Sequence, residues 1–214
     1  AGMHSITVSL DGFEDAHNWL RCHPLSFQRA TEAIRMLTGE EEIIWDVVTC
    51  VNQNNIEQLP AFRDFLIGIG VRRWRIFTIF PVGRAAEVPE LQLSDKQFTG
   101  LLDFIVSTRQ EGKIQLNFAC EGFLGRYEMK ARDYFYHCNA GISVASVRVD
   151  GSISGCPSIR ANYNQGNIYR DDFMQVWNER FVPFRDREWA RQGECADCSM
   201  FRYCEGNGMH LHDE

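Results

Sequence analysis

The chain of 214 residues is 44% hydrophobic and 24% charged, which is ordinary globular composition for about one to one and a half domains. Its 22 basic and 29 acidic side chains give a net charge of −7, which argues against a nucleic-acid-binding protein because such proteins need a basic face. No apolar run approaches the roughly 20 residues that span a bilayer, and we expect no signal peptide. We therefore expect a cytoplasmic protein that binds no nucleic acid and has no membrane span.

Strands and helices alternate through the first 119 residues. Runs of β-branched and apolar residues predict strands at 6–10, 43–51, 74–80 and 114–119. Apolar residues at helical spacing predict helices between them, at 26–37, 56–69 and 94–105. Ser26 is the expected N-cap of the first helix, and Ser94 with Gln97 forms a capping box for the third.

This βαβαβαβ order predicts an α/β fold with a parallel sheet and helical crossovers. Four such units are too few to close an eight-stranded barrel. Two interpretations stay open, namely a small open sheet and a partial (β/α) barrel whose first strands are missing.

From residue 120 onward the helical periodicity fades. The segment 143–153, with Asp150-Gly151 at its centre, predicts a β-hairpin, and 171–180 predicts one short helix. We therefore place a domain boundary near residue 120, with an α/β part at 1–119 and a small Cys-rich α+β part at 120–214.

Cysteines dominate the second part. The chain has eight, at positions 22, 50, 120, 138, 156, 195, 198 and 204. Disulfide scaffolds belong mostly to small secreted chains, so clustered thiols here favour a metal. Cys195 and Cys198 have the two-residue spacing that lets both thiolates face one metal, and Cys204 follows. Thiolates alone suit iron–sulfur clusters, whereas addition of His210 or His212 would make a zinc site.

The order of several motifs resembles the SPASM domain, the C-terminal module of many radical S-adenosylmethionine (SAM) enzymes, which holds auxiliary 4Fe-4S clusters. The motifs are Gly151-Ser-Ile-Ser-Gly-Cys156-Pro157, Gln165-Gly-Asn-Ile168, Trp177 and Cys195-x2-Cys198-x5-Cys204. The tail after Cys204 looks most like the branch associated with lipoproteins.

The first part is similar to the radical SAM core from its fourth strand onward. The residues that carry this resemblance are Ser9-Leu-Asp11-Gly12 and Arg21. The resemblance implies that Ser9 and Arg21 contact the carboxylate of SAM. Asp11 and Asn52 end their strands and are further candidates for cofactor binding, although each could equally serve only a turn. Cys22 and Cys50 lack companions at metal spacing and are interpreted as buried or incidental thiols.

Two departures from the family pattern matter. The chain contains no Cys-x3-Cys-x2-Cys triplet, the motif that ligates the SAM-cleaving cluster, so the chain looks N-terminally truncated and on its own is expected to be inactive. Gly208 stands where the family has a further cysteine, and no cysteine follows Cys204, so the sites formed by Cys138, Cys156, Cys195, Cys198 and Cys204 are incomplete. Cys120 is the candidate substitute for the cysteine missing at position 208.

The resemblance implies a fragment of an oxidoreductase that modifies a peptide or protein through a 5′-deoxyadenosyl radical, served by an electron donor protein. No catalytic residue can be assigned from the sequence. The alternative is a non-enzymatic zinc-binding module that recognises a protein partner.

Overall fold

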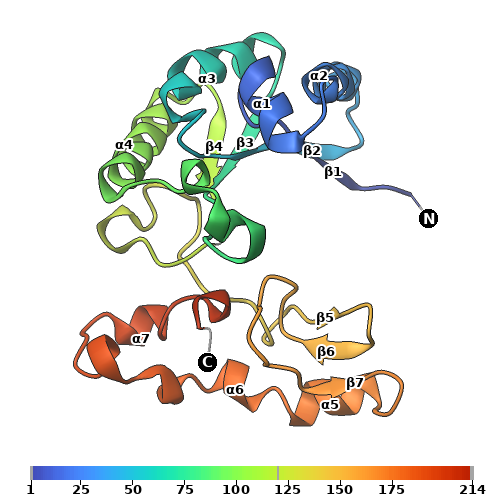
Figure 1. Ribbon diagram of the computed structural model, residues 1–214, viewed down its shortest axis with the longest axis vertical. Coiled ribbons are helices and arrows are strands. Elements are labelled where there is room, and N and C mark those ends of the chain that lie inside the picture. Colours follow the sequence, from blue (N-terminus) through green and yellow to red (C-terminus); the bar gives the residue numbers. More distant parts are fainter. Residues whose placement is uncertain (1, 120, 213–214) are drawn as a thin grey trace. The chain divides into compact units, whose positions relative to one another are not determined.

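The computed structural model describes residues 2–119 and 121–212. The chain divides into two compact units, one comprising residues up to Glu121 with 126–134, and the other residues 122–125 with 135 onward. Figure 1 labels the helices and strands of both.

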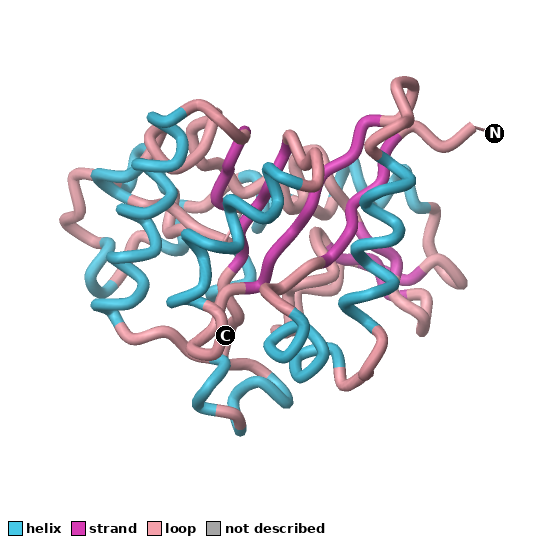
Figure 2. Tube along the Cα trace, turned by 90° about the horizontal axis from the view of Figure 1, so that it is seen from above, coloured by secondary structure: helices cyan, strands magenta, loops and turns pink. Residues whose placement is uncertain are grey.

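The first unit is built on a four-stranded, fully parallel sheet in the order β1-β2-β3-β4. The strands are β1 (Ser5–Ser9), β2 (Ile44–Cys50), β3 (Arg73–Phe77) and β4 (Gln115–Phe118). The helices are α1 (Glu14–Arg21), α2 (Ser26–Leu37), α3 (Leu59–Gly68) and α4 (Asp95–Glu111). Figure 2 shows the strands of this sheet in magenta beside their helices. The parallel order and its helical crossovers are confirmed.

Local sequence signals account for the starts of α3 and α4. The capping box of Ser94 and Gln97 is formed as predicted, and Pro60 lies in the first turn of α3, where its missing N–H costs nothing. Two expectations were wrong. Helix α1 was not predicted, and the N-cap position of α2 is Leu25 rather than Ser26, whose hydroxyl lies 2.9 Å from Nε2 of His17.

One face of the sheet packs against the helices. Trp74 is fully buried, and its ring meets those of Phe62 from α3 and Phe104 from α4 at 6.0 and 6.1 Å. Its indole N–H donates to the Thr49 hydroxyl at 2.8 Å, which in turn donates to the Leu10 carbonyl at 2.6 Å. This hydrogen-bonded relay satisfies polar atoms inside an apolar layer.

The second unit has little regular structure. It contains β5 (Ser146–Val147), β6 (Ser152–Ser154) and β7 (Gly166–Asn167) in one antiparallel sheet, and the short helices α5 (Phe173–Glu179), α6 (Val182–Arg185) and α7 (Phe201–Cys204). The predicted hairpin and the helix at 171–180 are confirmed as β5–β6 and α5.

Aromatic side chains fill the core of the second unit. Phe181 and Phe184 lie 5.2 Å apart, fully buried with Met209 and Ile153. Gly155 allows this close packing, because a Cβ there would stand 2.3 Å from the Phe184 ring.

Among the described helices, none is long and apolar enough to cross a membrane.

Thr49→Val should destabilise the first unit by about 1–3 kcal/mol, because it leaves the Trp74 N–H and the Leu10 carbonyl buried without their hydrogen bonds. Urea unfolding followed by tryptophan fluorescence measures this, with exposed Thr99→Val in α4 as the matched control. Equal midpoints for the two variants would show that the relay contributes nothing.

Candidate functional site

Polar side chains gather at the carboxyl edge of the parallel sheet. Asp11 follows β1, Cys50 ends β2, Thr78 follows β3, and Glu121 follows β4. In (β/α) barrels and open parallel sheets alike, this is the edge where ligands bind. It is therefore the candidate site of the first unit.

Asp11 is the centre of this edge and is fully buried. Its Oδ2 accepts a hydrogen bond from Arg21 Nε at 2.6 Å and lies 3.2 Å from His17 Nδ1, while Oδ1 accepts from the Cys50 N–H at 2.8 Å. Burial by itself raises the pKa of Asp11, but its interactions with the His17 and Arg21 side chains and with the Cys50 N–H outweigh burial and hold the pKa below 3.8. Asp11 is thus an ionised anchor that joins β1, β2 and α1.

The other predicted cofactor residues differ in their burial and in their hydrogen-bond partners. Arg21 is joined to Asp11, and its side chain remains 35% exposed. Ser9 is half-buried at the end of β1. Asn52 is buried and engaged in its own turn, where its Nδ2 donates to the Cys50 carbonyl and its Oδ1 accepts from the Asn54 N–H. The structure therefore brings Asp11 and Arg21 together and uses the Asn52 amide locally.

Sequence reasoning missed two groups at this edge. The Glu121 carboxylate accepts hydrogen bonds from the N–H and the hydroxyl of Thr78 at 2.7 and 2.8 Å, and burial raises its pKa to about 7. Burial, together with the charge of Asp11, also raises the pKa of the Cys50 thiol to about 11. The only feature of the sequence that could have indicated these two groups as site residues is their position at the ends of strands.

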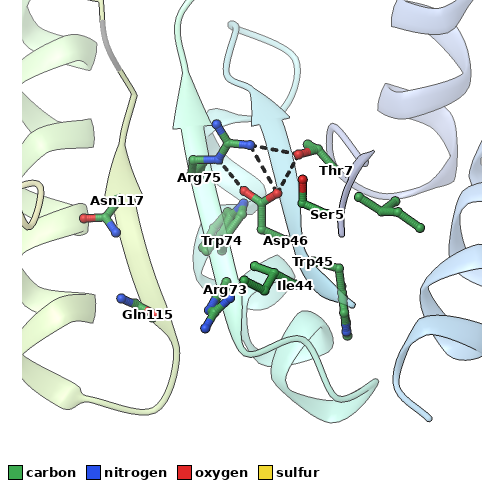
Figure 3. A pocket seen from close by; sticks show the side chains of 11 residues that line it. Ser5, Thr7, Ile44, Trp45, Asp46, Arg73, Trp74, Arg75, Gln115 and Asn117 are labelled. Carbon is green, nitrogen blue, oxygen red and sulfur yellow. Dashed lines mark hydrogen bonds and ion pairs between the residues drawn. The ribbon is translucent and has the colours of Figure 1, made fainter. Parts of the chain in front are cut away.

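A cavity of about 380 Å³ opens on the sheet at residues nearer the starts of the strands. Figure 3 shows Arg75 reaching Asp46 and Thr7 across neighbouring strands. The Thr7 hydroxyl also donates to Asp46 at 2.7 Å. These side chains bond to one another and form a polar layer on the face of the sheet opposite Trp74.

The thiols of the second unit are the candidate ligands of an iron–sulfur cluster. All five described there are free and half-buried: Cys138, Cys156, Cys195, Cys198 and Cys204. Cys138 and Cys156 pack against the same apolar cluster, and the Met209 N–H points at Cys138 Sγ at 3.5 Å. Thiols beside an apolar core, with backbone N–H directed at sulfur, suit an iron–sulfur cluster. Cys120 lies outside the described residues.

A single-ion site is not formed within 2–119 and 121–212, where no three His, Cys, Asp or Glu side chains come together around one point. In the zinc alternative, His212 was a possible ligand. Its Nε2 instead lies 2.7 Å from the Gly206 carbonyl and 3.4 Å from Arg187, and its ring packs edge-on against Trp189. A four-iron cluster spreads its ligands over four metal atoms, so it needs no such convergence on one point.

Three kinds of similarity to known proteins are found, namely a family match, sequence relatives and solved structures. Residues 138–199 match SPASM, described as an iron–sulfur cluster-binding domain. The chain is 25% identical, over 96% of its length, to the AdoMet-dependent heme synthase of Methanosarcina barkeri, and 24% identical, over its whole length, to that of Oleidesulfovibrio alaskensis. It spans only 62% and 61% of the lengths of these two relatives.

Two solved structures share its fold. Native anSMEcpe with bound AdoMet and the Cp18Cys peptide aligns with a TM-score of 0.64 at 18% identity, covering 98% of this chain and 61% of that one. Streptococcus suis SuiB bound to S-adenosylmethionine aligns at 0.67 and 16% identity, covering 94% and 49%. The expected fold, a partial parallel barrel followed by a small C-terminal domain, is consistent with both.

Replacing Asp11 by Asn should cost about 1–3 kcal/mol of stability at pH 7, since the buried carboxylate loses its charge and its ion pair with Arg21. The folded-state pKa of Asp11 is lowered, so its stabilisation is present above the unfolded value near 3.8 and disappears as the pH falls through the folded-state pKa.

The difference in urea midpoint between wild type and Asp11→Asn should therefore shrink at pH values below about 4. Asp15→Asn, on the exposed side of α1, is the control. A difference that is the same at pH 7 and pH 3 would contradict the assignment of Asp11 as an ionised anchor.

Proposed function

We propose that this chain, which carries a SPASM domain and is related to the radical SAM enzymes, is the part of such an enzyme that helps bind SAM and holds auxiliary iron–sulfur clusters. The observation that carries the proposal is the SPASM match at 138–199, which contains four of the five free thiols described in the second unit. The substrate proposed is a peptide or protein.

Arg21 is the proposed contact for the SAM carboxylate. Asp11 holds its Nε, and among the described residues nothing bonds to the two terminal amino groups of the guanidinium. A planar guanidinium can pair both of these groups with the two oxygens of a carboxylate. The buried anchor at Asp11 would keep the group oriented before SAM arrives, which reduces the ordering cost of binding.

The thiols Cys138, Cys156, Cys195, Cys198 and Cys204 are the proposed cluster ligands, together with Cys120. When bound, auxiliary clusters supply one-electron chemistry close to the substrate. The protein's own contribution is to hold two of these thiols, Cys138 and Cys156, at the edge of an apolar core that excludes water.

The 214 residues contain no Cys-x3-Cys-x2-Cys triplet. We propose that the radical step of the whole enzyme depends on a cluster ligated outside these residues, and that an electron donor protein reduces it. The chain studied by itself would then bind SAM weakly and not cleave it.

A tetrapyrrole is the second candidate substrate. It is favoured by the curated relatives, which are named heme synthases and align with 96–100% of this chain. The peptide candidate is favoured by the shared fold with the peptide-bound anSMEcpe. Saturable one-to-one binding of hemin, seen as quenching of tryptophan fluorescence, would favour the tetrapyrrole, and its absence would favour the peptide.

Arg21→Lys should weaken SAM binding about tenfold, because the lysine keeps the charge and loses the planar pair of donors. Equilibrium dialysis with labelled SAM measures the affinity. Arg35→Lys, at the exposed end of α2, is the matched control and should bind as wild type does. Equal affinities for the two variants would remove Arg21 from the SAM site.

Oxygen-free reconstitution should load the wild-type chain with iron and matching acid-labile sulfide and give a broad absorbance near roughly 400 nm. Cys195→Ser with Cys198→Ser should lower both contents, whereas Cys22→Ser, an exposed thiol of the first unit, should not. Zinc without sulfide would instead support the non-enzymatic zinc module.

A further inference from the structure

The segment 208–210 passes directly beside a proposed cluster thiol. The Met209 N–H donates to Cys138 Sγ at 3.5 Å, and Met209 itself is fully buried in the apolar cluster against which Cys138 and Cys156 both pack. The residues on either side of Met209 are therefore held close to Cys138 by a buried side chain and by a backbone hydrogen bond.

The His210 imidazole folds back over Gly208. A Cβ at position 208 would stand 2.6 Å from Cε1 and 2.9 Å from Nδ1 of His210, and 2.7 Å from the Tyr136 hydroxyl. Real side chains do not approach this closely, so the imidazole fills the space that a side chain at position 208 would enter. The Nε2 atom of His210 is shielded from solvent.

The resemblance to the SPASM domain implies a cysteine at the position that Gly208 occupies, so the side chain that fills this space bears on cluster ligation. The ring atoms that fill the space belong to the one other side chain type that commonly ligates iron in place of a thiolate. In iron–sulfur centres, exchange of thiolate for imidazole raises the reduction potential, since a neutral ligand stabilises the reduced cluster relative to an anionic one.

We propose that His210, and not Cys120, takes the position of the missing cysteine as a ligand of the iron–sulfur cluster bound by Cys138 and Cys156. This inference rests on the cluster-binding part of the proposed function. It gives that cluster mixed sulfur and nitrogen ligation and a higher reduction potential than cysteine ligation alone.

The test uses the full chain, labelled with ¹⁵N only at histidine, reconstituted with iron and sulfide and reduced with dithionite. Pulsed electron paramagnetic resonance should detect a strongly coupled ¹⁵N nucleus in the wild type. The coupling should vanish in His210→Ala and in His210→Cys, and His210→Cys should have the lower midpoint potential. It should persist in His137→Ala, an exposed imidazole next to Cys138.

The possible failures are distinguishable. Iron and sulfide uptake without histidine coupling in the wild type, or with coupling that survives in His210→Ala, overturns the role of His210 and leaves the proposed function standing. No iron uptake overturns both. If His210→Ala does not fold, the comparison of the labelled wild type with His210→Cys still tests the proposal, because the ¹⁵N coupling should be present in the first and absent from the second.

Discussion

The buried carboxylate of Asp11 is the contact on which the first unit depends. It follows β1, accepts the N–H of Cys50 at the end of β2, and holds the guanidinium of Arg21 at the end of α1. An ionised group without solvent exposure is tolerated only because these donors surround it. One side chain thus joins the ends of β1 and β2 to the end of α1, at the edge where the proposed SAM contact lies.

The second unit has a small core and little regular secondary structure. Its strands and helices are short, and its core is a small cluster of aromatic rings around Phe181 and Phe184. Two thiols, Cys138 and Cys156, pack on this cluster. A metal cluster held by such thiols would add covalent cross-links to a unit whose strands and helices are short. Cluster binding and folding of this unit are therefore expected to be coupled.

Much of the fold could be predicted from the sequence, because its signals are local. The alternation of strands and helices, the capping box at Ser94 and the turn at Asp150-Gly151 depend on residues close together in the chain. Helix α1 escaped prediction because its apolar face is short, and its buried His17 reads as polar.

The site was predicted only in part, since its contacts join distant segments. Asp11 and Arg21 were candidates, but no pattern indicates that Glu121 accepts from Thr78, 43 residues earlier in the chain. Asn52 is a predicted cofactor residue because it follows a strand, and the contacts of its amide with backbone groups of its own turn belong to the turn role that the sequence left open. The position of the His210 imidazole over Gly208 likewise involves contacts near Tyr136 and Met209. The spacing of residues in the sequence does not indicate these contacts.

The most direct test of this account is an oxygen-free crystal structure of the reconstituted chain, with iron located by its anomalous scattering. The account predicts iron beside Cys138, Cys156 and His210, and iron beside Cys195, Cys198 and Cys204. Iron at neither place, or a single zinc ion held by Cys195, Cys198, Cys204 and a histidine, would contradict it.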